Sequence, residues 1–124
     1  MNFTEILPNE QPHGGLDALF AELHELCGQR FYLAPDIPEK KIDNARNSYA
    51  ADLHPSAVII ALLDTSFWGS AKFGCFFTAT RICSRDSHFG IKRTAITPQT
   101  VISIENNLLL VDGSPLLSVH GKRK

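Results

Sequence analysis

The chain has 124 residues, a length that suits one domain with a single modest hydrophobic core. Apolar residues make up 44% and charged residues 20%, so the composition excludes an intrinsically disordered chain. Twelve Lys and Arg residues against thirteen Asp and Glu residues leave no strong field to attract nucleic acid or an anionic lipid surface, and we expect neither as a partner.

The amino-terminal stretch MNFTEILPNE lacks the basic start and the long apolar run of a signal peptide. The three cysteines, Cys27, Cys75 and Cys83, are odd in number and irregular in spacing. The longest apolar run, Ala57 to Leu63, is far shorter than the roughly 20 residues that cross a bilayer. These features predict a cytoplasmic protein without integral membrane contact.

Residues 1–15 contain prolines and a Gly14-Gly15 pair without clear periodicity, and we predict a flexible arm there, followed by one domain over residues 16–124. The domain opens with an amphipathic helix whose apolar residues recur at helical spacing and whose end is marked by Gly28. The stripe consists of Leu16, Leu19, Phe20, Leu23 and Cys27.

A second helix is predicted from Pro38, because proline suits the first helical position, where its missing N–H is not needed. Its apolar face is narrow and consists of Ile42, Ala45 and Tyr49. We expect its charged and polar residues to form a solvated face, made up of Lys40, Lys41, Asp43, Arg46 and Asn47.

Strand patterns dominate the rest of the chain, after an early strand candidate at Phe31–Leu33. The Asp112-Gly113 pair predicts a type I′ turn, in which both central residues have positive φ. The later strands are predicted at 58–63, 72–78, 81–85, 90–96, 100–105, 108–111 and 115–119. The predicted fold class is α+β, with two N-terminal helices followed by about seven short antiparallel strands.

Two stretches, FYLAPDIPEKKI at residues 31–42 and LDTSFWGSAKFGCFFT at residues 63–78, carry a resemblance to a known family. Together with Asn44-Ala45 and Tyr49-Ala50, they resemble the bacterial pleckstrin-homology-like (PH-like) domains of uncharacterised and stress-associated proteins, over about residues 31 to 111. The resemblance implies seven strands in two orthogonal sheets that form a barrel or sandwich. It also implies a role in binding or assembly, and it assigns no ligand-binding residue.

The chain departs from the family pattern in two places. Arg81 stands where the family usually has glycine after its first hairpin turn, so we expect a different turn type here. We also expect the C-terminal helix that normally closes one end of the fold to be missing, because only five residues follow Val119 in this sequence. The helix Leu16 to Cys27, or a partner subunit, would cover that end instead.

Metal and catalytic patterns are weak. Cys75, Cys83 and His88 lack the close ligand spacing of small zinc sites, so we predict no metal and no cofactor. Ser66 and Ser70, with Asp64 and His88, supply the residue types of a hydrolase without any of its sequence motifs, so we predict no catalytic residue.

The loop before the third predicted strand is the best candidate binding site. Lys72 lies near Ser70 and two glycines, where it could contact an anion, and Asp64 with Thr65 could stiffen the loop through hydrogen bonds from side chain to backbone. Phe67 and Trp68 point in opposite directions if extended, so one could be an interaction anchor, although core packing of both is the simpler alternative. The predicted binding residues are Phe67, Trp68, Ser70 and Lys72.

These observations favour a non-enzymatic, bacterial protein-binding or assembly module that uses a protein partner or self-association. Two alternatives stay open. One is a small cytoplasmic enzyme with an unrecognised site between Asp64 and Lys72. The other is a self-assembling structural protein that pairs through the edge of the hairpin Leu108 to Val119.

Overall fold

The structure, a computed structural model, describes residues 11–67 and 69–119 and has the predicted α+β class. Two helices and eight antiparallel strands form its regular elements. In chain order they are α1 (Gln11–Cys27), the 3₁₀ turn η2 (Gly28–Arg30), β1 (Phe31–Leu33), α2 (Glu39–Tyr49), β2 (Ala61–Asp64), β3 (Gly74–Phe77), β4 (Arg81–Asp86), β5 (Gly90–Ala95), β6 (Ile102–Glu105), β7 (Leu108–Val111) and β8 (Ser114–Ser118).

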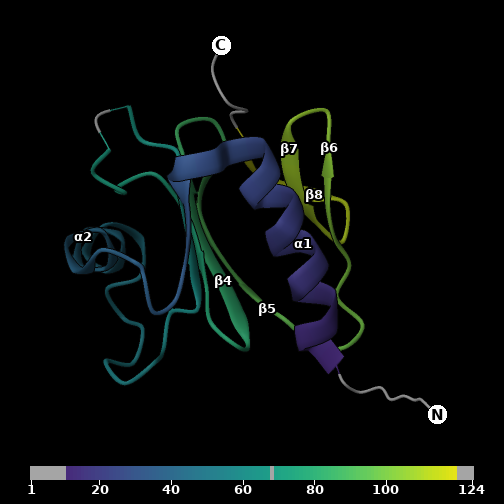
Figure 1. The fold of residues 1–124 in the computed structure, drawn as a ribbon, viewed down its shortest axis with the longest axis horizontal. Coiled ribbons are helices and arrows are strands. Elements are labelled where there is room, and N and C mark those ends of the chain that lie inside the picture. Colours follow the sequence, from purple (N-terminus) through teal and green to yellow (C-terminus); the bar gives the residue numbers. More distant parts are fainter. Residues whose placement is uncertain (1–10, 68, 120–124) are drawn as a thin grey trace.

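The strands form two sheets, each with its strands in chain order. One sheet has five strands, β1 to β5, and the other has three, β6 to β8. Figure 1 shows α2 on one side of the five-stranded sheet, with α1 and the three-stranded sheet on the other side. The central strands of the five-stranded sheet are therefore covered on both faces.

The helix α1 packs its predicted apolar stripe into the larger core. Leu23 is fully buried, and the Phe20 ring lies 5.6 Å from the Phe31 ring and 5.0 Å from the Phe77 ring, measured between centroids. The same cluster contains Leu109 and Leu117 of the three-stranded sheet. The prediction that this stripe faces inward is confirmed, and α1 joins the cores of both sheets.

The opposite face of the five-stranded sheet packs on α2. Tyr49 stacks on Phe76 with 5.6 Å between ring centroids, and Ala45 is fully buried beside them. Side chains alternate along a strand, so Cys75 and Phe77 of β3 face α1, whereas Phe76 faces α2. This two-sided burial explains why β2 and β3 consist almost entirely of apolar residues.

The turns follow the sequence chemistry. Asp112 and Gly113 have φ values of 51° and 85°, as the predicted type I′ turn requires. Arg81 is the first residue of β4 and has no positive φ, so this turn differs in type from one that needs glycine, as expected.

Several boundaries differ from the predictions. Helix α1 begins at Gln11 rather than Leu16. A proline is tolerated in the first turn of a helix, because the N–H groups there have no intrahelical partner. Residues 1–10 of the predicted arm lie outside the described residues. Strand β1 occupies Phe31–Leu33, so the early strand candidate is confirmed, and with the seven later strands it makes eight in the described part of the chain. Strand β2 begins at Ala61 rather than at residue 58 as predicted. Val58 is 69% exposed, so the start of this apolar run is not buried in the core.

The sheets do not close into a barrel: within the described part of the chain, no ladder joins β5 to β6. The predicted absence of a C-terminal helix concerns residues 120–124, which lie outside that part. Among the described residues, no helix has the length and apolar character needed to span a bilayer.

If α1 holds the two sheets together, Leu23→Ala should lower the free energy of unfolding by about 3 kcal/mol, since it removes a fully buried side chain from the shared core. The exposed neighbouring change Glu22→Ala should alter stability by less than about 0.5 kcal/mol. Urea unfolding of both variants measures the difference. Equal stabilities would contradict this role for α1.

Candidate functional site

The loop between β2 and β3 is organised by the carboxylate of Asp64, which is 2% exposed. Asp64 Oδ1 accepts hydrogen bonds from the Ser66 backbone N–H at 2.9 Å and from the Ser66 hydroxyl at 2.5 Å. Ser66 Oγ in turn accepts the N–H of Ala71 at 3.1 Å. The expectation that Asp64 stiffens the loop is confirmed, because these bonds connect the end of β2 to Ser66 and Ala71 within the loop.

Side chains from both helical regions hold this loop in place. Lys41 of α2 donates to Asp64 Oδ2 and to the carbonyl oxygen of Gly69, both at 2.6 Å. Arg30, which follows α1, donates to the carbonyl oxygens of Asp64 and Ser66, both at 3.0 Å. Asn44 of α2 donates to the Ser70 carbonyl oxygen at 2.9 Å.

The predicted solvated face of α2 is therefore wrong at two positions. The Lys41 side chain is only 18% exposed because it reaches the buried carboxylate of Asp64. Arg46 donates to the carbonyl oxygens of His54 and Ala57, so it braces the segment after the helix. The helical spacing correctly predicts that Lys41 and Arg46 lie off the apolar stripe. It cannot predict that loops from other parts of the chain cover them.

Burial and pairing act in opposite directions on the Asp64 carboxyl. Burial tends to raise its pKa, but the hydrogen bonds from Lys41 and Ser66 outweigh burial and hold the pKa below its ordinary value. The carboxylate is thus charged, buried and fully engaged, which suits a structural role.

Gly74 pairs with Asp64 across the β2–β3 ladder. A residue with a side chain would not fit at this position, because the backbone of β2 lies too close. The φ of Gly74 is +132°, and a Cβ placed there would lie 2.0 Å from the carbonyl oxygen of Leu63. This glycine lets β3 approach the end of β2.

The structure describes three of the four predicted binding residues, Phe67, Ser70 and Lys72, and none of them lines either of the two pockets described below. Phe67 is 82% exposed, and Trp68 lies outside the described residues. Ser70 Oγ accepts the backbone N–H of Lys72 at 3.2 Å, and Lys72 is exposed.

The groups considered for chemistry are also separated or already engaged. The Ser66 hydroxyl is buried and bonded at both ends, and His88 lies in the turn after β4, where its N–H donates to Asp86. Cys75 and Cys83 belong to clusters on opposite faces of the sheet. Over residues 11–67 and 69–119, no three His, Cys, Asp or Glu residues gather as metal ligands would.

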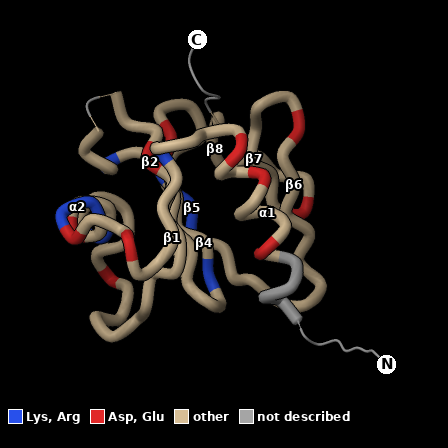
Figure 2. Tube along the Cα trace, in the orientation of Figure 1, with Lys and Arg blue, Asp and Glu red and all other residues tan. Residues whose placement is uncertain are grey.

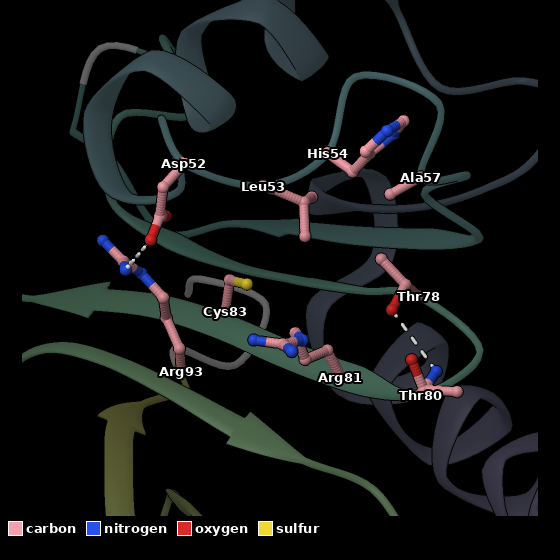
Figure 3. A pocket seen from close by; sticks show the side chains of 9 residues that line it. All are labelled: Asp52, Leu53, His54, Ala57, Thr78, Thr80, Arg81, Cys83 and Arg93. Atoms are coloured by element: carbon pink, nitrogen blue, oxygen red, sulfur yellow. Dashed lines mark hydrogen bonds and ion pairs between the residues drawn. The ribbon is translucent and has the colours of Figure 1, made fainter.

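A pocket missed by the sequence analysis lies on the α2 side of the five-stranded sheet and has a volume of about 270 Å³ (Figure 3). It is framed by the segment after α2, the β3–β4 turn and the adjoining strands β4 and β5. Its lining residues are Asp52, Leu53, His54, Ala57, Thr78, Thr80, Arg81, Cys83 and Arg93.

The lining of this pocket includes two arginines and one carboxylate. Arg93 pairs with Asp52 at 2.8 Å, with both side chains largely exposed, and its Nε donates to the Tyr49 carbonyl oxygen at 3.3 Å. Arg81 enters from the neighbouring strand (Figure 3). The sequence pattern singled out Arg81 only for its turn type, and no local pattern joins it to Asp52 and Arg93, which come from other segments of the chain.

A second pocket, of about 390 Å³, lies near the β4–β5 turn. Asp86 dominates it, and its carboxylate accepts the backbone N–H groups of His88, Phe89 and Ser118. These bonds occupy both carboxylate oxygens. Asp86 therefore stabilises the β4–β5 turn and attaches it to β8.

Strand β5 presents an open edge. Among the described strands it pairs only with β4. The Ile96 N–H donates to the Thr80 carbonyl oxygen at 2.7 Å, which shows which backbone groups of this segment point toward β4. Bonded residues alternate along an antiparallel strand, so the backbone N–H and C=O groups of Ile91, Arg93 and Ala95 point away from β4. All three residues are exposed.

Comparison of the chain with protein-family models, with curated proteins and with solved structures finds no match. The resemblance to PH-like domains therefore stays a prediction, and the function has to be argued from this structure alone.

The pairing of Asp64 makes the stability of the fold depend on pH. A carboxyl with a lowered folded-state pKa stabilises the fold above its ordinary pKa, and that contribution is lost as the pH falls through the folded-state value. We predict that Asp64→Asn lowers the free energy of unfolding by about 3 kcal/mol at pH 7 and reduces its fall towards pH 3.

Asp43→Asn is the matched control, because Asp43 is an exposed carboxyl on the same helix as Lys41. Urea unfolding of the wild type and both variants between pH 3 and pH 7 provides the measurement. Identical pH profiles for the wild type and Asp64→Asn would contradict the structural role of this carboxylate.

Proposed function

We propose that this chain is a non-enzymatic protein-binding module that adds an extended segment of a partner protein to the free edge of β5. The observation that carries the proposal is the row of outward backbone groups at Ile91, Arg93 and Ala95. Within the described residues, no other segment forms a backbone hydrogen bond with this row. Such an edge pairs readily with another extended chain.

The opposite edge of the sheet is a poorer candidate. Strand β1 has three residues, whereas β5 has six and can offer a longer ladder. Ile91 is 51% exposed beside the outward backbone groups and provides an apolar contact for a partner side chain. Affinity would come from the backbone bonds and specificity from such side-chain contacts.

Charge favours a different protein over a second copy of this chain. Lys92 and Arg93 occupy the middle of β5, so two copies paired through this strand would bring like charges together. In Figure 2, basic positions are visible on β4 and β5. An extended segment with acidic residues complements this edge, and we propose that partner chemistry.

A PH-like β core is part of the proposal. Without β1, the strands β2 to β8 are seven antiparallel strands in two sheets, which supports the likeness implied by the sequence. The buried helix α1 covers the core that both sheets share, as expected of a substitute for a closing helix. Three free, buried thiols support a reducing cytoplasmic location.

A proline scan of β5 tests the proposal. Ala95→Pro removes an outward N–H while leaving the ladder to β4 intact, so the variant should fold and lose binding. Ala95→Ser keeps that N–H and should bind as the wild type does. The probes are acidic peptides that are selected from a displayed random library for binding to the wild-type protein.

Peptide affinity for the three proteins is measured by fluorescence anisotropy, and circular dichroism checks folding. We expect the affinity for Ala95→Pro to fall at least about tenfold, equivalent to about 1.4 kcal/mol. Undiminished binding by this variant would refute the edge site. A concentration-dependent homodimer that Ala95→Pro dissociates would instead favour the self-assembling alternative.

A further inference from the structure

Two arginines converge on the α2-side pocket from adjacent strands. Arg81 is opposite Ala95, and Cys83 is opposite Arg93, so Arg81 and Arg93 are diagonal neighbours on one face of the β4–β5 ladder. Diagonal positions are about 7–8 Å apart, within reach of long side chains. Figure 3 shows the Arg81 side chain extending from the end of β4 back toward Cys83.

Of these two guanidinium groups, only that of Arg93 has an ion-pair partner among the described residues. Asp52 pairs with Arg93, but the side chains are 69% and 40% exposed, so solvent screens the pair and a competing anion could displace it. Within the described ranges, the Arg81 side chain has no ion pair or hydrogen bond. Its fork of donors is therefore available to a ligand.

The floor of the pocket lies in a positive field. Cys83 is 1% exposed there, and burial raises the pKa of its thiol, while Arg81, Arg93 and Arg46 act to lower it and Asp52 acts to raise it. Arg81 and Arg93 both line the pocket, and Asp52 is the one carboxylate in its lining. An anion that displaces Asp52 from Arg93 would meet both guanidinium charges, which a doubly charged anion complements.

Hydroxyl groups add neutral donors at the pocket wall. Thr78 Oγ1 accepts the backbone N–H of Thr80 at 3.3 Å, which leaves the hydroxyl hydrogen of Thr78 able to donate. The Thr80 hydroxyl lies at the same wall. The N–H groups of an arginine guanidinium can donate two parallel hydrogen bonds to a phosphate group, and hydroxyl groups can donate to its remaining oxygens.

We propose that this pocket binds the phosphate group of a small phosphorylated molecule, with Arg81 and Arg93 as its charged contacts. The volume of about 270 Å³ lies near the lower end of small-molecule sites, so it accommodates a phosphate with a modest organic part. The site is separate from the backbone groups on the β5 edge, and it exists whether or not that edge binds a partner.

Titration of the full chain with inorganic phosphate tests the proposal, with amide chemical shifts followed by NMR at constant ionic strength. We expect saturable shifts at Thr80, Arg81 and Arg93, with a dissociation constant on the order of 1 mM. Arg81→Gln should weaken binding at least about tenfold, because it removes the charge and the fork. Arg81→Lys should bind with intermediate affinity.

Arg85→Gln is the matched control. Arg85 lies on the same strand, but its guanidinium group covers the Phe73 ring at 4.3 Å and does not line the pocket, so binding should be unchanged. Phosphate shifts that do not saturate, or that Arg81→Gln leaves intact in a folded protein, would overturn the site. Equally tight binding of acetate would overturn the choice of a doubly charged ligand. Because Ala95→Pro leaves Arg81 and Arg93 in place, failure of the peptide test would leave this test unaffected.

Discussion

The five-stranded sheet needs cover on both faces, and the rest of the structure follows from that constraint. Strands β2 and β3 are buried along their whole length, with one row of side chains facing α1 and the other facing α2. Removing so much apolar surface from water is the main driving force available to a chain of this size. Cover decreases toward β5, where alternate side chains are exposed and the backbone edge is open. The candidate partner surface and the arginine-lined pocket both occupy this less covered end.

One buried carboxylate connects the parts that provide the cover. Asp64 ends β2 and pairs with Lys41 of α2, and its carbonyl oxygen accepts a hydrogen bond from Arg30 in the turn η2 that follows α1. A buried charge is costly unless every oxygen is engaged, and here both carboxylate oxygens have partners. The loop that looked most like a binding site in the sequence is thus better understood as a clamp. Side chains from both helical regions hold its backbone in place, and the binding role of Phe67, Trp68, Ser70 and Lys72 stays a prediction.

The sequence predicted those features that depend on local patterns. The stripe of α1, the hairpin turn at Asp112 and Gly113, and most strands follow from spacing and turn chemistry. The pocket could not be predicted from local patterns. It combines residues from the segment that follows α2, from the β3–β4 turn and from two strands whose register is set by tertiary packing. The partner of Lys41 was missed for the same reason, since 23 positions separate it from Asp64. Spacing identifies which face of an element a residue occupies, and only the assembled layers determine what that face meets.

The claim that function lies at the open end of the sheet is tested most directly by native-state amide hydrogen exchange along β5. The register predicts slow exchange at Lys92, Thr94 and Ile96, whose N–H groups point to β4, and fast exchange at Ile91, Arg93 and Ala95. The β2 and β3 amides, covered on both faces, should be the slowest in the chain. Uniformly slow exchange along β5 would mean that its edge is already occupied, and would contradict the account.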